Sequence, residues 1–81
     1  MDTRIFKALS DPTRLGLVKI LLKGKRCACE LPEMVKKAQP TVSLQLKKLR
    51  AARILTCRKE GRKCIYRVSD PKVKRILELI G

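Results

Sequence analysis

Apolar residues recur at helical spacing in five segments of the chain, and this pattern predicts five helices. The segments cover residues 3–9, 12–23, 30–37, 39–53 and 72–80. Two of the predicted helices begin with strong N-cap signals. Asp11 suits the N-cap of the second helix, with Pro12 at its first helical position, and Ser69-Asp70-Pro71 repeats this arrangement before the last helix. Gly24 ends the second helix. That helix is apolar around nearly its whole circumference, so it is predicted to be the most buried element.

Two later segments, residues 54–58 and 63–68, alternate between apolar and polar positions and predict a β-hairpin. A turn centred on Glu60-Gly61 would join them and would place Cys57 directly opposite Cys64. Residues 25–28 leave room only for a brief extended stretch. The resulting order, ααβααββα, is that of a winged helix-turn-helix, a mainly α fold with a small β-hairpin. Residues 1–81 are expected to form one such domain, because a chain of this length is typical of a single domain.

The net charge is the strongest feature of the composition. The 81 residues include 21 Lys and Arg against 7 Asp and Glu, so the formal charge is +14. That much positive charge on a small folded body favours a polyanionic partner, and nucleic acid is the usual one. The chain has one Phe, one Tyr and no Trp, which argues against a membrane-surface helix with bulky apolar anchors and against a single-strand binder that stacks bases. Duplex DNA is therefore the expected partner.

Two absences narrow the function further. The chain has no histidine, which removes the commonest general base, and its scattered carboxylates offer no acid/base pair, so it is not expected to be an enzyme. Its longest apolar run, Ile20-Leu21-Leu22, is too short to span a bilayer, and its first residues lack the apolar core of a signal peptide. A cytoplasmic protein without a membrane partner is expected.

Basic residues gather in the predicted helix-turn-helix and hairpin, where Glu60 is the only acid between residues 36 and 67. The N-terminal part of a recognition helix enters the major groove, where short polar side chains read base edges and an outward Leu can touch a thymine methyl. The basic side chains of the helix and the hairpin are expected to meet phosphates or the minor groove. The candidate DNA contacts are Gln39, Thr41, Ser43, Leu44, Gln45, Lys47, Lys48, Arg50, Arg58, Lys59, Arg62 and Lys63.

The same segments resemble a known family. Residues 6–15, which contain Ser10-Asp11-Pro12-Thr13-Arg14, resemble the opening signature of the ArsR/SmtB repressors, the arsenical- and metal-responsive family. Residues 39–50 resemble its recognition helix, residues 58–68 its wing, and Cys27-Ala28-Cys29-Glu30-Leu31 the metalloid-binding segment of some members. The resemblance implies a homodimeric transcriptional regulator, usually a repressor, that leaves DNA when it binds its inducer. Lys36 stands where the family often has a glycine in the turn.

A dimer is also expected from geometry. One recognition helix reads few base pairs, whereas two helices related by a two-fold axis read a palindromic operator. The first and last helices are the expected interface, because they carry more apolar surface than a small monomer needs. The alternative is that they only close the core of the monomer. The interface candidates are Ile5, Phe6, Leu9, Ile76, Leu77 and Ile80.

Cys27 and Cys29 are the candidate effector site. Cys29 is expected to be the N-cap of the third helix, whose amides would favour its thiolate, and Cys27 would add a second sulfur. Thiolates suit As(III) or another thiophilic metal ion, and they also react with oxidants. The resemblance implies a third cysteine at the position held by Pro32. It also implies a second kind of site, with His and carboxylates on the last helix, which a chain without histidine lacks.

Cys57 and Cys64 are a separate signal. They are candidates for a disulfide across the hairpin, although such bonds are rare inside cells. A zinc site uniting all four cysteines is an alternative, but their spacing is not that of paired zinc knuckles. If every cysteine is structural, the chain is a DNA-binding regulator without an effector. A protein of another class, which coats DNA without sequence preference, would also carry this charge.

Overall fold

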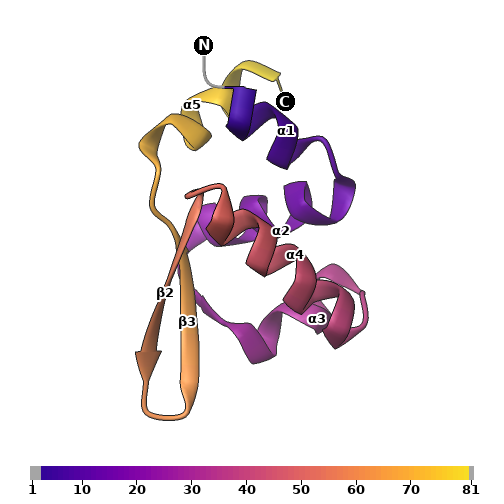
Figure 1. The fold of residues 1–81 in the computed structure, drawn as a ribbon, viewed down its shortest axis with the longest axis vertical. Coiled ribbons are helices and arrows are strands. Elements are labelled where there is room, and N and C mark those ends of the chain that lie inside the picture. The colour runs from indigo at the N-terminus through magenta and orange to yellow at the C-terminus, as the bar shows by residue number, and fades with distance from the viewer. Residues whose placement is uncertain (1–2, 81) are drawn as a thin grey trace.

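Five α-helices and a three-stranded sheet make up the computed structural model, which describes residues 3–80, the side chain of Ile80 excepted. The helices are α1 (Thr3–Leu9), α2 (Pro12–Lys23), α3 (Leu31–Val35), α4 (Gln39–Ala51) and α5 (Pro71–Ile80). The strands are β1 (Arg26–Cys27), β2 (Leu55–Glu60) and β3 (Lys63–Val68), and a 3-10 turn, η1 (Ala28–Glu30), precedes α3. This order confirms the predicted winged helix-turn-helix (Figure 1).

The helices α2 and α5 begin where their cap residues predict. Asp11 Oδ2 accepts a hydrogen bond from the Arg14 amide at 3.0 Å, and Pro12 opens α2. Asp70 Oδ1 accepts one from the Lys72 amide at 2.9 Å. These short carboxylates satisfy amides that have no partner inside the helix.

Two helical segments end earlier than the apolar pattern predicts. α4 stops at Ala51 and not at Arg53, because Arg53 has a left-handed backbone with φ 61°. The predicted helix over residues 30–37 is divided into η1 and α3, and Lys36 caps α3 with φ 57° and ψ 47°. That conformation favours glycine. Lys36 therefore holds a strained backbone in the turn between α3 and α4.

The hairpin has a different register from the predicted one. Cys57 pairs with Tyr66 and not with Cys64, because Gly61-Arg62 form the turn where Glu60-Gly61 were expected. Gly61 has φ 63°, and a two-residue turn of type II′ needs a glycine at its first central position. The predicted direct pairing of Cys57 and Cys64 is therefore wrong. They are diagonal neighbours on one face of the sheet, and both thiols are free.

One hydrophobic core joins the five helices to the sheet, whose strand order is β1-β3-β2. Leu17 of α2, Leu49 of α4 and Ile54 before β2 are fully buried in it. α1 and α5 lie side by side at one end of the molecule, and the tip of the hairpin lies at the other (Figure 1). No helix within residues 3–80 is long and apolar enough to cross a membrane.

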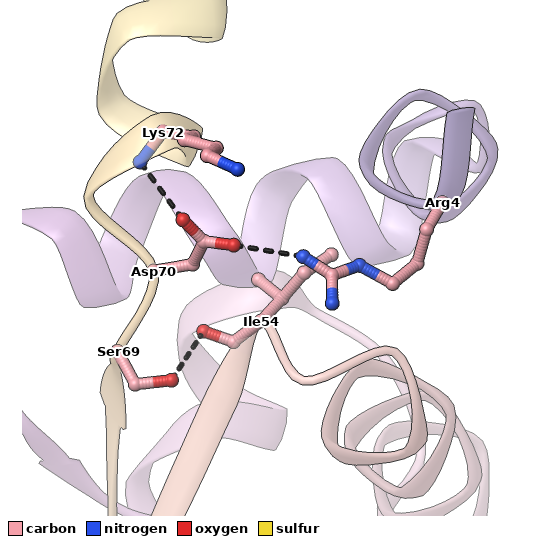
Figure 2. Close-up of polar contacts among 5 residues, drawn as sticks. All are labelled: Arg4, Ile54, Ser69, Asp70 and Lys72. Carbon is pink, nitrogen blue, oxygen red and sulfur yellow. Dashed lines mark hydrogen bonds and ion pairs between the residues drawn. The ribbon is translucent and has the colours of Figure 1, made fainter. Parts of the chain in front are cut away.

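Polar contacts fix the start of α5 against the rest of the domain. Arg4 Nη2 of α1 lies 2.8 Å from Asp70 Oδ2, and Ser69 Oγ donates to the Ile54 carbonyl at 3.3 Å (Figure 2). The carboxylate that caps α5 is thus also the one that ties it to α1. These contacts hold the start of α5, and Val73 and Leu77 pack its later turns into the core.

Replacing Gly16 with Ala is expected to raise the free energy of unfolding by about 0.5–1 kcal/mol, because glycine in a helix interior loses more backbone entropy on folding than alanine does. A Cβ at this position in α2 would meet Val35 Cγ1 at 3.9 Å, which is ordinary contact. Urea unfolding followed by circular dichroism measures the change. Gly61→Ala is the matched control and should lose stability, since its φ of 63° disfavours any side chain. A loss for Gly16→Ala would show that α2 and α3 pack too closely for a methyl group.

Candidate DNA-binding surface and thiol groove

α4 divides its side chains between the core and solvent. Val42, Leu46 and Leu49 recur at i, i+4 and i+7 and are at most 2% exposed, which fixes the orientation of the helix. Leu44 points the other way and is 51% exposed. The exposed polar and basic candidates on α4 are Gln39, Thr41, Ser43, Lys47, Lys48 and Arg50. The outer half of α4 is therefore a polar and basic surface with one leucine among its outermost side chains.

Gln45 has a different environment from the other candidates on α4. Its Oε1 accepts a 2.8 Å hydrogen bond from Arg14 Nη1 of α2, and Arg14 Nε donates to the Ala8 carbonyl at 2.7 Å. Arg14 therefore ties the end of α1 and the start of α2 to the middle of α4. This contact holds the Gln45 side chain against α2. The sequence pattern could not reveal it, because the two partners are 31 residues apart.

The hairpin presents the second set of basic candidates. Arg58, Lys59, Arg62 and Lys63 are all exposed. They surround the turn that Gly61 opens, and β2 packs against α4, which holds the hairpin beside that helix. This arrangement sets a basic wing next to the exposed surface of α4, as expected from the sequence.

Cys27 and Cys29 are in direct contact. The Cys29 thiol donates a hydrogen bond to Cys27 Sγ at 2.8 Å. Cys27 is buried and is the N-cap of η1, whereas Cys29 is exposed and lies inside that turn, so the predicted cap role of Cys29 is wrong. The cap moves because the 3-10 turn starts before the predicted helix does. Glu30 closes the turn by accepting a hydrogen bond from the Cys27 amide at 3.0 Å.

The contact between these two cysteines separates their acidities. The hydrogen bond from Cys29 lowers the pKa of Cys27, and the charge of Lys63 lowers it further. The same hydrogen bond, with partial burial, raises the pKa of Cys29. The thiolate is the nucleophilic and metal-binding form of cysteine. The structure thus favours the thiolate at Cys27, where the sequence had favoured it at Cys29.

Both thiols line a groove of about 240 Å³ between η1, α4 and the wing. Cys64 of β3 lines the same groove. Gln39 and Ser43, two candidate base readers, border it from α4. The effector candidates and the DNA-binding candidates therefore share one surface. Within residues 3–80, no three Cys, Asp or Glu side chains already stand close enough to hold a metal ion.

The predicted dimer residues divide into two groups. Ile5, Leu9 and Leu77 are at most 9% exposed within the single chain, so they close its own core, as the alternative expected. Phe6 remains 39% exposed, and Ile76 is half-buried. The side chain of Ile80 lies outside the described residues. Leu79 is 85% exposed and was missed, because it falls outside the apolar stripe that buries Val73 and Leu77. The apolar surface left on α1 and α5 is smaller than predicted.

Comparison with known proteins gives consistent matches. Residues 11–56 match the family described as "Bacterial regulatory protein, arsR family". An uncharacterized HTH-type transcriptional regulator of Methanocaldococcus jannaschii is 44% identical over 77 residues, which are 94% of this chain and 86% of that protein. The arsenical resistance operon repressor of Staphylococcus xylosus is 42% identical over 65 residues, which are 80% of this chain. The match covers 62% of that repressor, which is therefore the longer protein.

A solved structure agrees with the sequence matches. The homodimeric winged helix-turn-helix DNA-binding domain from Mycobacterium bovis, a possible ArsR-family regulator, superposes with a TM-score of 0.86 at 27% identity. The superposition covers 96% of this chain and 72% of that one. The two chains therefore share the same fold over nearly the whole of this chain.

Proposed function

Because the chain belongs to the ArsR family of bacterial regulatory proteins, we propose that it is a homodimeric transcriptional repressor that releases its operator when a thiophilic metal or metalloid ion binds Cys27 and Cys29. The family resemblance predicted from the sequence is confirmed. The family consists of transcriptional regulators, so the chain is not an enzyme. The winged helix-turn-helix is a DNA-binding fold.

The exposed outer half of α4 is the observation that carries the DNA-binding proposal. Its core stripe is buried, so Gln39, Thr41 and Ser43 at the N-terminal end are directed outward, where a recognition helix meets base edges. Lys47, Lys48 and Arg50 follow toward the C-terminal end, where they would meet phosphates. The wing adds four more basic side chains. The net charge of +14 supports the same partner.

Two substitutions on α4 are expected to separate base reading from phosphate contact. Ser43→Ala should relax base preference and cost about 1–3 kcal/mol on the preferred site only. Lys47→Ala should weaken binding to operator and random duplex about equally and flatten the salt slope by about one unit. Fluorescence anisotropy with DNA from upstream of its own gene, a half-site and a random duplex measures both. If the random duplex competes equally with the upstream DNA, the chain is a DNA-coating protein and the repressor proposal fails.

Homodimerisation is proposed through α1 and α5. Phe6, Ile76 and Leu79 leave apolar surface on these neighbouring helices. The M. bovis domain is homodimeric, and its fold matches over 96% of this chain. Two copies would present two α4 helices about 34 Å apart, one turn of DNA, to a palindromic site. The half-site in the anisotropy experiment tests this geometry, because a dimer binds the full palindrome far more tightly.

The effector proposal is carried by the Cys27–Cys29 pair. Cys27 Sγ accepts a hydrogen bond from Cys29, and Lys63 lies near enough to favour the thiolate, which is the ligand form. Soft thiolates select thiophilic ions. The S. xylosus relative is an arsenical resistance repressor, which supports arsenite as the first ion to try. The groove borders Gln39 and Ser43, so an occupied site would lie against the DNA-reading surface.

Cys27→Ser is expected to abolish the response of DNA binding to arsenite while leaving affinity without arsenite unchanged. Anisotropy of the operator complex, titrated with arsenite at fixed salt, measures it. Cys57→Ser is the matched control, because Cys57 does not line the groove, and it should respond as the unaltered protein does. An unaltered protein that binds its operator but ignores arsenite and other thiophilic ions would instead make Cys27 and Cys29 structural or redox-active.

A further inference from the structure

We propose that Cys64 of the wing is the third thiol ligand of the ion bound by Cys27 and Cys29, so that a trivalent, thiophilic ion such as As(III) links η1 to β3. This inference rests on the proposed function and extends it by naming the ligand set. It also changes how binding would act on DNA, since Cys64 belongs to the hairpin that carries the basic wing residues.

Sheet pairing brings the backbone at Cys64 close to Cys27. β1 pairs with β3 so that Cys27 stands opposite Ile65, which places the Cys64 backbone one residue away. Because successive strand residues face opposite sides of the sheet, the Cys64 side chain leaves β3 on the other face from Cys27. Cys27, Cys29 and Cys64 line one groove, although they come from segments more than 30 residues apart. The fourth cysteine, Cys57, is on the neighbouring strand β2 and does not line this groove. Three of the four cysteines therefore border one groove.

The chemistry of the groove suits a soft ion that binds only sulfur. Among the described residues, the three cysteines are the only thiols that line it and its lining holds no carboxylate, while the Glu30 carboxylate binds the Cys27 amide outside it. Lys63 and Arg62 line it from the wing, and their charges favour thiolates over thiols. Arsenous acid, As(OH)3, would react with three thiols to form three As–S bonds. Three As–O bonds break, three thiol protons are transferred, and three water molecules leave, with no change of oxidation state.

Cys64 has to move to complete this site. Within residues 3–80 no three ligand side chains are yet close enough for a metal, whereas Cys27 and Cys29 are already in contact. Cys64 instead lies diagonally across the hairpin from Cys57, and the interaction of the two thiols raises the pKa of Cys64. Binding would exchange that contact for a bond to the ion and draw β3 toward η1. The wing would then shift relative to α4, and the ion would occupy the groove beside Gln39 and Ser43.

Two arsenicals of different valence test the third ligand. Arsenite takes three thiols, whereas phenylarsine oxide takes two and releases one water molecule. Cys64→Ser is expected to weaken arsenite binding more than about tenfold, since even outer-shell changes at metal sites cost 10- to 100-fold. Its affinity for phenylarsine oxide should stay unchanged. Ultraviolet absorbance of the sulfur–arsenic bonds, measured on reduced protein free of added thiols, reports both titrations. Circular dichroism checks that each variant is folded.

Cys57→Ser is the matched control, because it changes the neighbouring thiol of the same hairpin. It should bind arsenite at least as tightly as the unaltered protein, since Cys64 would lose its present partner. If Cys64→Ser binds both arsenicals like the unaltered protein, the third-ligand proposal is wrong and the two-thiol site stands. If Cys27→Ser also binds both normally, or no form binds either arsenical, the proposed effector site itself fails.

Discussion

Raising the salt concentration from about 50 to about 200 mM is expected to weaken operator binding by roughly 10³–10⁵-fold. The size of this effect follows from the number of basic side chains on the proposed DNA-binding surface. Seven of the exposed lysines and arginines on α4 and the wing of each protomer are the candidate contacts: Lys47, Lys48, Arg50, Arg58, Lys59, Arg62 and Lys63. A dimer carries this set twice. If about half of these side chains reach phosphates, the count falls in the range of about 6–10 contacts that gives such a slope.

The measurement is the logarithm of the dissociation constant against the logarithm of salt concentration, for operator and random duplex alike. Release of counterions from the DNA sets the slope at about −0.9 per phosphate contact, so a slope between about −5 and −9 is expected for log affinity. Lys74→Ala is the matched control for substitutions on the surface. Lys74 is exposed on α5, at the end of the molecule opposite the hairpin tip (Figure 1), and its loss should leave the slope unchanged.

A slope shallower than about −3 would contradict this account. It would mean that few of the seven side chains reach the backbone, and that apolar and base contacts carry the affinity. An equal slope with equal affinity for operator and random DNA would favour a coating protein, because the electrostatic contribution is independent of sequence. The salt series thus tests both the extent and the specificity of the surface.

Local signals in the sequence were enough for the fold. Asp11 and Asp70 cap the helices that they were predicted to cap, since an N-cap depends only on residues two or three positions away. The core stripe of α4 follows from spacing alone, and Val42, Leu46 and Leu49 are buried as predicted. The winged helix-turn-helix follows from the order of these elements.

The hairpin register could not be predicted from the alternating pattern. The predicted pairing of Cys57 with Cys64 and the observed pairing with Tyr66 differ by two residues along β3. A shift of two keeps every side chain on its own face of the sheet, so burial favours neither register. The difference depends on whether Gly61 takes the first or the second position of the turn. Its positive φ at the first position decides the register.

Long-range contacts account for the rest of what sequence reasoning missed. Arg14 holds Gln45 across 31 residues, and β1 brings Cys27 beside the segment that carries Cys64. Neither contact has a signature in residue spacing. A search for motifs in the sequence finds the Cys27–Cys29 pair because it is local, whereas the proposed third ligand comes from another strand and can be considered only once the sheet is assembled.

Leu49→Ala is expected to lower the free energy of unfolding by about 2–5 kcal/mol, because it removes buried methyl groups and leaves a cavity. Leu49 is 0% exposed, and its carbonyl accepts a 3.0 Å hydrogen bond from the Ile54 amide where α4 leads into β2. Small domains have about 0.05–0.15 kcal/mol of stability per residue, or about 4–12 kcal/mol for this chain. The substitution therefore removes a large fraction of the total stability.

Leu44→Ala makes the same chemical change on the same helix, at a side chain that is 51% exposed. Its effect on unfolding should stay within about 0.5 kcal/mol, since surface substitutions away from special features cost little. Urea unfolding at one fixed protein concentration compares the two variants. Equal losses would mean that α4 packs by a different face from the one described. If Leu44→Ala keeps its stability and weakens operator binding, whereas Leu49→Ala loses stability first, then one helix face builds the fold and the opposite face reads the DNA.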